Sequence, residues 1–187
     1  MSFLVWKLSW HRFHNVNNMK QALVFISGFM GTGKTAVGRA LARRLRLRFY
    51  DSDAEIERRA KMSVARIFET KGEAHFRRLE KAVVRELSMK ICVVSLGGGA
   101  LLDAETARLV SSCSVALTCA EPELWRRLKP EAARRPLLAG GRAALRVLCR
   151  KRRGLYDNAV IRVSTTRRSP AAAAALIEKG LAARGFL

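Results

Sequence analysis

The chain has 187 residues, enough for one compact α/β domain with a sizeable core, and 49% of them are apolar, which excludes a disordered chain. No apolar stretch approaches the roughly 18 residues that a membrane span needs, so we expect no membrane association. The formal net charge of +21 favours polyanionic partners, which include nucleotides and small acids as well as nucleic acid. The basic residues are spread along the whole chain, which favours a compositional bias together with phosphate binding over a nucleic-acid partner.

The first 20 residues differ from the rest, since they hold two of the three Trp and two of the three His. They lack the long apolar core and the cleavage site of a signal peptide. We expect residues 1–20 to be an N-terminal extension that is either disordered or not native, with translation beginning at Met19. A single domain then covers residues 21–187.

Apolar runs and turn residues predict strands that alternate with helices. The predicted strands are residues 22–27, 47–50, 91–96, 114–118 and 160–163. The predicted helices are residues 34–45, about 53–90 with a break near Lys71-Gly72, 103–110, 121–128, 142–153 and a last helix that Pro170 opens. Residues 129–141 are expected to be irregular. This alternation predicts right-handed βαβ units, hence a five-stranded parallel sheet flanked by helices on both faces.

The segment Gly28-Phe29-Met30-Gly31-Thr32-Gly33-Lys34-Thr35 has the spacing of a phosphate-binding P-loop and stands between a predicted strand and a predicted helix. Its glycines let the backbone present successive N–H groups to phosphate oxygens, and the helix that follows adds its positive end. Lys34 is expected to reach the β- and γ-phosphates, and the Thr35 hydroxyl to hold Mg²⁺. We expect ATP to be bound by Gly31, Thr32, Gly33, Lys34, Thr35 and Ala36.

A P-loop occurs in GTPases, ATPases, nucleoside-phosphate kinases and small-molecule kinases. The chain is too short for a motor-type ATPase, and it shows no Asn-Lys-x-Asp motif for guanine. Four further segments follow the P-loop in order: Asp51-Ser52-Asp53, Phe76-Arg77-Arg78-Leu79-Glu80, Ser95-Leu96-Gly97-Gly98-Gly99-Ala100, and Arg135-Pro136-Leu137-Leu138 followed by Lys151-Arg152-Arg153-Gly154-Leu155-Tyr156. With these segments the chain resembles the shikimate kinase family over about residues 23–180. The resemblance implies a three-layer P-loop kinase fold with a mobile lid.

The pair Asp51 and Asp53 points two carboxylates in one direction at the end of a strand, although Asp53 is also suited to cap the next helix. The resemblance implies that Asp51 lies near Mg²⁺ and that Asp53 binds the hydroxyls of shikimate, where it can orient the attacking hydroxyl and accept its proton. Arg77 matches the arginine that binds the carboxylate of shikimate, and Glu80 lies on the same helix face to brace it. On its own, that pair would be an ordinary surface ion pair.

The resemblance also implies that Gly97, Gly98 and Gly99 let bare backbone approach the substrate ring, and that Arg152 is a second clamp on the carboxylate. The chain has Gly154 where the family has proline.

On the nucleotide side, the resemblance implies a lid over about residues 129–150 whose Arg135 closes over the γ-phosphate. Arg127 is expected at the adenine or the phosphates, with Arg126 as a competitor for that role. Arg167 and Pro170 are expected to flank the adenine.

The implied activity is transfer of the γ-phosphoryl group of MgATP to the 3-hydroxyl of shikimate, with Lys34, Asp53 and Arg135 as catalytic residues. Two alternatives stay open: a kinase for another small acid such as gluconate, and a basic nucleic-acid-binding protein on a degenerate kinase fold. We expect a monomer. The four cysteines form no zinc-type cluster, and three of them lie in apolar strand-like runs, so we expect a cytoplasmic protein.

Overall fold

The computed structural model describes residues 22–187, apart from the side chains at positions 133, 134 and 136, so the predicted extension lies outside the described residues. The described chain forms one five-stranded sheet in the order β2-β3-β1-β4-β5, with every neighbouring pair parallel. The strands are β1 (Val24–Gly28), β2 (Arg48–Asp51), β3 (Cys92–Ser95), β4 (Ser114–Thr118) and β5 (Ile161–Ser164). The predicted parallel sheet is confirmed, and each strand lies within two residues of its predicted bounds.

The α-helices of residues 22–187 are α2 (Lys34–Leu45), α3 (Ser52–Ala60), α4 (Val64–Leu87), α5 (Ala104–Val110), α6 (Glu121–Leu128), α7 (Gly141–Arg152) and α8 (Pro170–Ala182), of which α8 follows the last strand. The predicted break near Gly72 is present as a kink inside α4, where Gly72 has φ 77°. The stretch predicted to be irregular contains two short 3-10 helices, Lys129–Arg134 and Pro136–Leu138. A further 3-10 turn, Arg153–Tyr156, follows α7.

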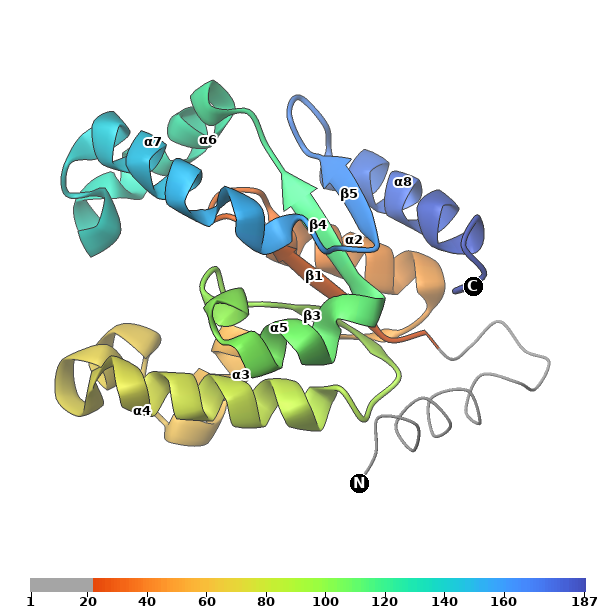
Figure 1. Cartoon of the computed structure of the whole chain (residues 1–187), viewed down its shortest axis with the longest axis horizontal. Coiled ribbons are helices and arrows are strands. Elements are labelled where there is room, and N and C mark those ends of the chain that lie inside the picture. Colours follow the sequence, from red (N-terminus) through yellow and green to blue (C-terminus); the bar gives the residue numbers. More distant parts are fainter. Residues whose placement is uncertain (1–21) are drawn as a thin grey trace.

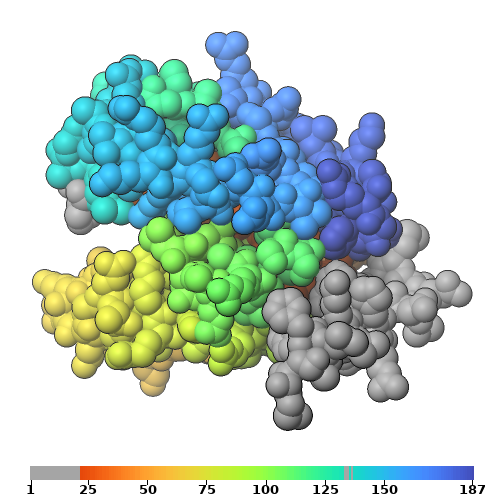
Figure 2. All heavy atoms as spheres, viewed as in Figure 1, coloured from red at the N-terminus to blue at the C-terminus, as the bar shows by residue number. Residues whose placement is uncertain are grey.

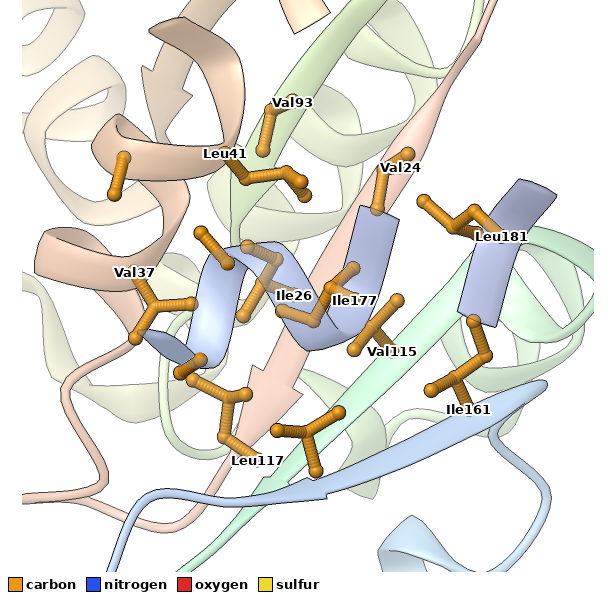
Figure 3. Packing of buried hydrophobic residues seen from close by; sticks show 14 of the residues in the cluster. Val24, Ile26, Val37, Leu41, Val93, Val115, Leu117, Ile161, Ile177 and Leu181 are labelled. Atoms are coloured by element: carbon orange, nitrogen blue, oxygen red, sulfur yellow. The ribbon is translucent and has the colours of Figure 1, made fainter. Parts of the chain in front are cut away.

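Helices cover both faces of the sheet, in three layers (Figure 1). On one face α2 and α8 pack against alternate strand residues, with Val24, Ile26, Leu41, Val115 and Ile177 at the centre of the cluster (Figure 3). On the other face α3, α4 and α5 pack against the intervening residues, Phe25 and Val94 among them. Burial on both faces explains why the strands are continuous apolar runs in the sequence.

A third apolar cluster, of Phe29, Leu124, Leu128, Leu138 and Leu145, joins the phosphate loop to α6, α7 and the segment between them. The space-filling view shows a notch between this α6–α7 region and α4 (Figure 2). The loops after β1, β2 and β3 all leave the carboxyl edge of the sheet, which is where parallel α/β sheets bind ligands.

Candidate active site

The loop between β1 and α2 is shaped to hold an anion. Gly33 precedes α2 with φ 85°, a left-handed conformation that favours glycine. Within the described part of the chain no side chain caps the start of α2, so its first N–H groups face the loop without a partner. Lys34 folds over the loop, where its Nζ donates to the carbonyls of Gly28 at 3.0 Å and Phe29 at 3.2 Å. Burial is the main cause that lowers the pKa of Lys34 to about 8, against the raising effect of Asp53 and Asp51.

The end of β2 places two carboxylates beside this loop. Thr35 Oγ1 donates to Asp51 Oδ2 at 2.7 Å, while Asp51 Oδ1 accepts from the N–H of Asp53 at 3.2 Å. The helix cap that the aspartate pair suits is therefore Asp51, not Asp53. Because Asp51 takes the capping role, the carboxylate of Asp53 is not used by the helix start.

Asp53 and Glu80 each bury a carboxylate oxygen that has no hydrogen-bond partner among the described residues, Oδ1 and Oε1 respectively. Both oxygens converge on Gly97, where a Cβ would lie 2.6 Å from Asp53 Oδ1 and 2.8 Å from Glu80 Oε1. Burial first, then the nearby Asp51 and Glu80, raise the pKa of Asp53 to about 6. An unpaired buried acceptor with a raised pKa is suited to take a proton from a bound hydroxyl.

Two arginines lie on either side of the triple-glycine loop. Arg77 donates to Glu80 Oε2 at 2.6 Å, as the sequence predicts, and also to Glu73 Oε1 at 3.0 Å. Its guanidinium lies so close to Gly99 that a Cβ there would be 2.7 Å from Arg77 Nη2. From the other side Arg152 Nη1 donates to the carbonyl of Gly98 at 3.1 Å. Both predicted clamp residues thus contact the loop that is expected to bind the acceptor.

The remaining arginines lie on the nucleotide side. Arg135 donates to Glu131 Oε2 at 2.7 Å, and its buried Nε has no partner within the described part of the chain. Arg127 donates to the carbonyls of Gly31 at 3.2 Å and Thr165 at 2.9 Å, so it links the phosphate loop to the segment after β5.

That segment carries the two residues that are expected to flank the adenine. Arg167 is exposed with φ 53°, and Pro170 opens α8.

A cavity of about 410 Å³ lies between the phosphate loop and the ends of β2 and β3; Arg77, Arg152, Gly97 and Gly99 are not among its lining residues. Its walls include Lys34, Thr35, Asp51, Asp53 and Arg135, all predicted from the sequence. Met30, Ser95 and Leu96 also line it, and they lie within the quoted motifs although the motifs alone give them no role. A second cavity, of about 320 Å³, lies between α5 and the residues after α7, and contains none of the predicted site residues.

Fold and site together define a P-loop kinase that acts on a small molecule. The sequence model of the shikimate kinase family matches residues 30–181. The chain is 45% identical to the shikimate kinase of Thermobifida fusca over 166 residues, which cover 87% of this chain and 96% of the relative. It is 49% identical to that of Ruegeria pomeroyi over 141 residues, 73% of this chain and 72% of the relative. The chain belongs to the shikimate kinase family and is an ATP-dependent transferase.

Solved structures agree with this assignment. The shikimate kinase from Acinetobacter baumannii in complex with shikimate superposes with a TM-score of 0.79 at 30% identity, covering 93% of this chain and 97% of that one. A gluconokinase from Sinorhizobium meliloti has a TM-score of 0.57 at 18% identity, covering 90% and 95%, and shares only the fold. The predicted fold is thereby confirmed, and the family assignment favours shikimate over gluconate. Among residues 22–187 no helix is long and apolar enough to cross a membrane.

Proposed function

We propose that this chain transfers the γ-phosphoryl group of ATP to the 3-hydroxyl of shikimate, giving shikimate 3-phosphate and ADP. The observation that carries the proposal is the cavity of about 410 Å³, which has the phosphate loop on one side and Asp53 with Gly98 on the other. A donor phosphate and an acceptor hydroxyl can therefore meet inside one enclosure, as an in-line transfer requires.

The donor side grips the phosphates with backbone N–H groups of Gly31 and Gly33 and with the Lys34 ammonium, whereas the N–H of Thr32 donates to the carbonyl of Phe29 at 3.3 Å. Lys34 now donates to two loop carbonyls, contacts that a bound phosphate would replace. Arg135 lies against the same cavity, so closure of the 129–150 lid brings a second cation toward the transferred group. Ala36 lines the cavity beside the loop. Arg167 and Pro170 flank the adenine, and Arg127 reaches the adenine or the phosphates.

The acceptor side acts by holding shikimate in one orientation. The shared contact of Arg77 with Glu80 and Glu73 keeps the guanidinium over Gly99, where it and Arg152 bind the carboxylate of shikimate. That grip directs the 3-hydroxyl toward Asp53, whose carboxylate orients it and takes its proton as the new P–O bond forms and the bond to ADP breaks. Lid closure excludes water, which would otherwise accept the phosphoryl group.

A Mg²⁺ ion fits the donor set at Thr35 and Asp51. These two oxygen ligands lie 2.7 Å apart at the cavity wall, and Mg²⁺ prefers one or two protein oxygens completed by phosphates and water. No cluster of three or more His, Cys, Asp or Glu that could hold a metal ion occurs in residues 22–187. The ion would neutralise phosphate charge when bound.

The protein is further proposed to act in the cytoplasm as a monomer with a single kinase domain. Its four cysteines are all free, which suits a reducing compartment.

Turnover of shikimate and gluconate, measured side by side with MgATP and followed by ³¹P NMR of the product, tests the proposed reaction. Shikimate should be phosphorylated at the 3-hydroxyl with gluconate inert. Faster turnover of gluconate would overturn the choice of acceptor, whereas turnover of neither acid together with salt-sensitive DNA or RNA binding would favour the nucleic-acid alternative.

A further inference from the structure

The triple-glycine loop leaves the sheet where the hydrogen-bond ladder between β2 and β3 ends. Along a strand, successive N–H groups point to opposite neighbours. The N–H of Leu96 donates to the carbonyl of Ile26 in β1 at 2.9 Å. The next N–H, that of Gly97, therefore points toward β2, but β2 has already ended at Asp51 and the chain has turned into α3.

A side chain supplies the acceptor that the backbone no longer offers. The Gly97 N–H donates to Ser52 Oγ at 2.9 Å. The sheet register pairs Asp51 with Ser95, so Ser52 comes directly beside the beginning of the loop. Ser52 is fully buried, with 0% of its surface exposed, and water therefore has no access to replace this hydroxyl.

Two glycines of the loop that Ser52 holds, Gly97 and Gly99, lie close against other side chains. Gly97 lies against the buried oxygens of Asp53 and Glu80, as its close approach to both carboxylates shows. A displacement of a few tenths of an ångström at Gly97 therefore changes the contact with Asp53.

Further along the loop, Gly99 lies under the guanidinium of Arg77, and the carbonyl of Gly98 accepts from Arg152. The loop thus lies against both of the arginines that are proposed to bind the carboxylate. Ser52 touches neither arginine, yet its bond fixes the point from which the loop departs.

We propose that Ser52 is a positioning residue for the acceptor site: its hydroxyl holds the triple-glycine loop in register so that Arg77, Arg152 and Asp53 face one substrate. This inference rests on the proposed function. Asp51 and Asp53 line the cavity, whereas Ser52, between them in sequence, does not line it and instead bonds to Gly97. A buried hydroxyl that only stabilises the fold would change the melting temperature and leave the substrate constants alone.

The test compares Ser52→Ala and Ser52→Thr with wild type and with Ser114→Ala. Ser114 is the control because its hydroxyl is also buried and also bonds to the backbone, but it donates to the carbonyl of Ser111 at 3.4 Å and lies at the opposite end of the sheet. Ser52→Ala should raise the KM for shikimate about tenfold, equivalent to about 1.4 kcal/mol, with the KM for ATP unchanged. Ser52→Thr keeps the hydroxyl and should restore most of the shikimate affinity, and Ser114→Ala should leave both KM values at wild type.

A folded Ser52→Ala variant with a wild-type KM for shikimate overturns the inference, and so does an equal rise in both KM values. If Ser52→Ala does not fold, the KM for shikimate is measured in Ser52→Cys instead, because a thiol has a similar shape but is a weak acceptor. A raised KM for shikimate in this variant supports the role of Ser52, and an unchanged KM refutes it.

Hydrogen exchange at the Gly97 amide gives a reading that does not depend on catalysis. The amide should be protected in wild type and exchange at least about tenfold faster in a folded Ser52 variant that lacks the oxygen. Unchanged protection would refute the role of Ser52. If the wild-type protein itself does not phosphorylate shikimate, the result counts against the proposed function and not against the role of Ser52.

Discussion

The buried carboxylate of Asp53 leads to a prediction in which activity and stability change in opposite directions. Its Oδ1 has no hydrogen-bond partner in residues 22–187, and it lies beside two further carboxylates, Asp51 and Glu80. Replacement by asparagine keeps the size of the side chain and removes its charge. If Asp53 is the group that accepts the proton, Asp53→Asn should lose turnover and gain stability.

The size of both effects follows from the structure. The pKa of Asp53 rises from its ordinary value of 3.8 to about 6. At about 1.4 kcal/mol per pKa unit, the ionised carboxylate destabilises the fold by roughly 3 kcal/mol at pH 7. Because the folded pKa is above the unfolded one, the penalty is absent below about pH 4 and grows as the pH rises toward 6.

Asparagine escapes most of this penalty, although its amide group also needs partners, so a gain of about 1 kcal/mol or more is expected. For a chain of this size that raises Tm by about 3 °C. Loss of the general base should lower kcat by about 10²- to 10⁴-fold.

The assay pairs steady-state turnover with thermal unfolding. Thermal unfolding is measured at pH 5 and at pH 7.5, in both cases without nucleotide and Mg²⁺. Binding of ATP should stay near wild type, because the phosphate loop is unchanged. Asp157→Asn serves as a control, since Asp157 is an exposed carboxylate paired with Arg162 and should leave kcat unchanged. Near-normal turnover in Asp53→Asn would refute the assignment of the base, and a lower Tm at pH 7.5 would refute the account of the buried charge.

Three other substitutions probe separate parts of the site. Arg77→Ala should raise the KM for shikimate at least about tenfold, because a charge-assisted bond to the carboxylate is lost; an effect confined to the KM for ATP would show that the clamp is misplaced. Gly98→Ala should fold normally, since the nearest atom to its Cβ is Met30 N at 3.9 Å, yet weaken shikimate binding because Gly98 lines the cavity; isothermal titration showing wild-type affinity would contradict this. Thr35→Val should raise the Mg²⁺ concentration for half-maximal activity several-fold, and an unchanged Mg²⁺ titration would exclude Thr35 as a ligand.

Features that depend on local pattern were predictable from the sequence. The strands are continuous apolar runs because both faces of the sheet are covered, and the phosphate loop has a spacing that its backbone geometry requires. The Arg77–Glu80 pair follows from helical spacing, which places residues three apart on one face.

Features that depend on the meeting of distant segments were not predictable from local pattern. Whether Asp51 or Asp53 caps α3 is decided by the turn at the end of β2, because both residues are aspartate, which is favoured at an N-cap. The bond from Gly97 to Ser52 joins residues 45 apart in sequence and exists only because β2 and β3 are neighbours. Serine between two acidic residues gives no sign of that contact.

The central claim is that one cavity brings ATP and shikimate together for direct transfer. Coupled ADP release, measured with MgATP in the presence and absence of shikimate, tests it most directly, with Lys34→Met as the inactive control. The account predicts rapid, saturable ADP release that requires shikimate and disappears in Lys34→Met. ADP release at the same rate without shikimate, or none with it, would contradict the account.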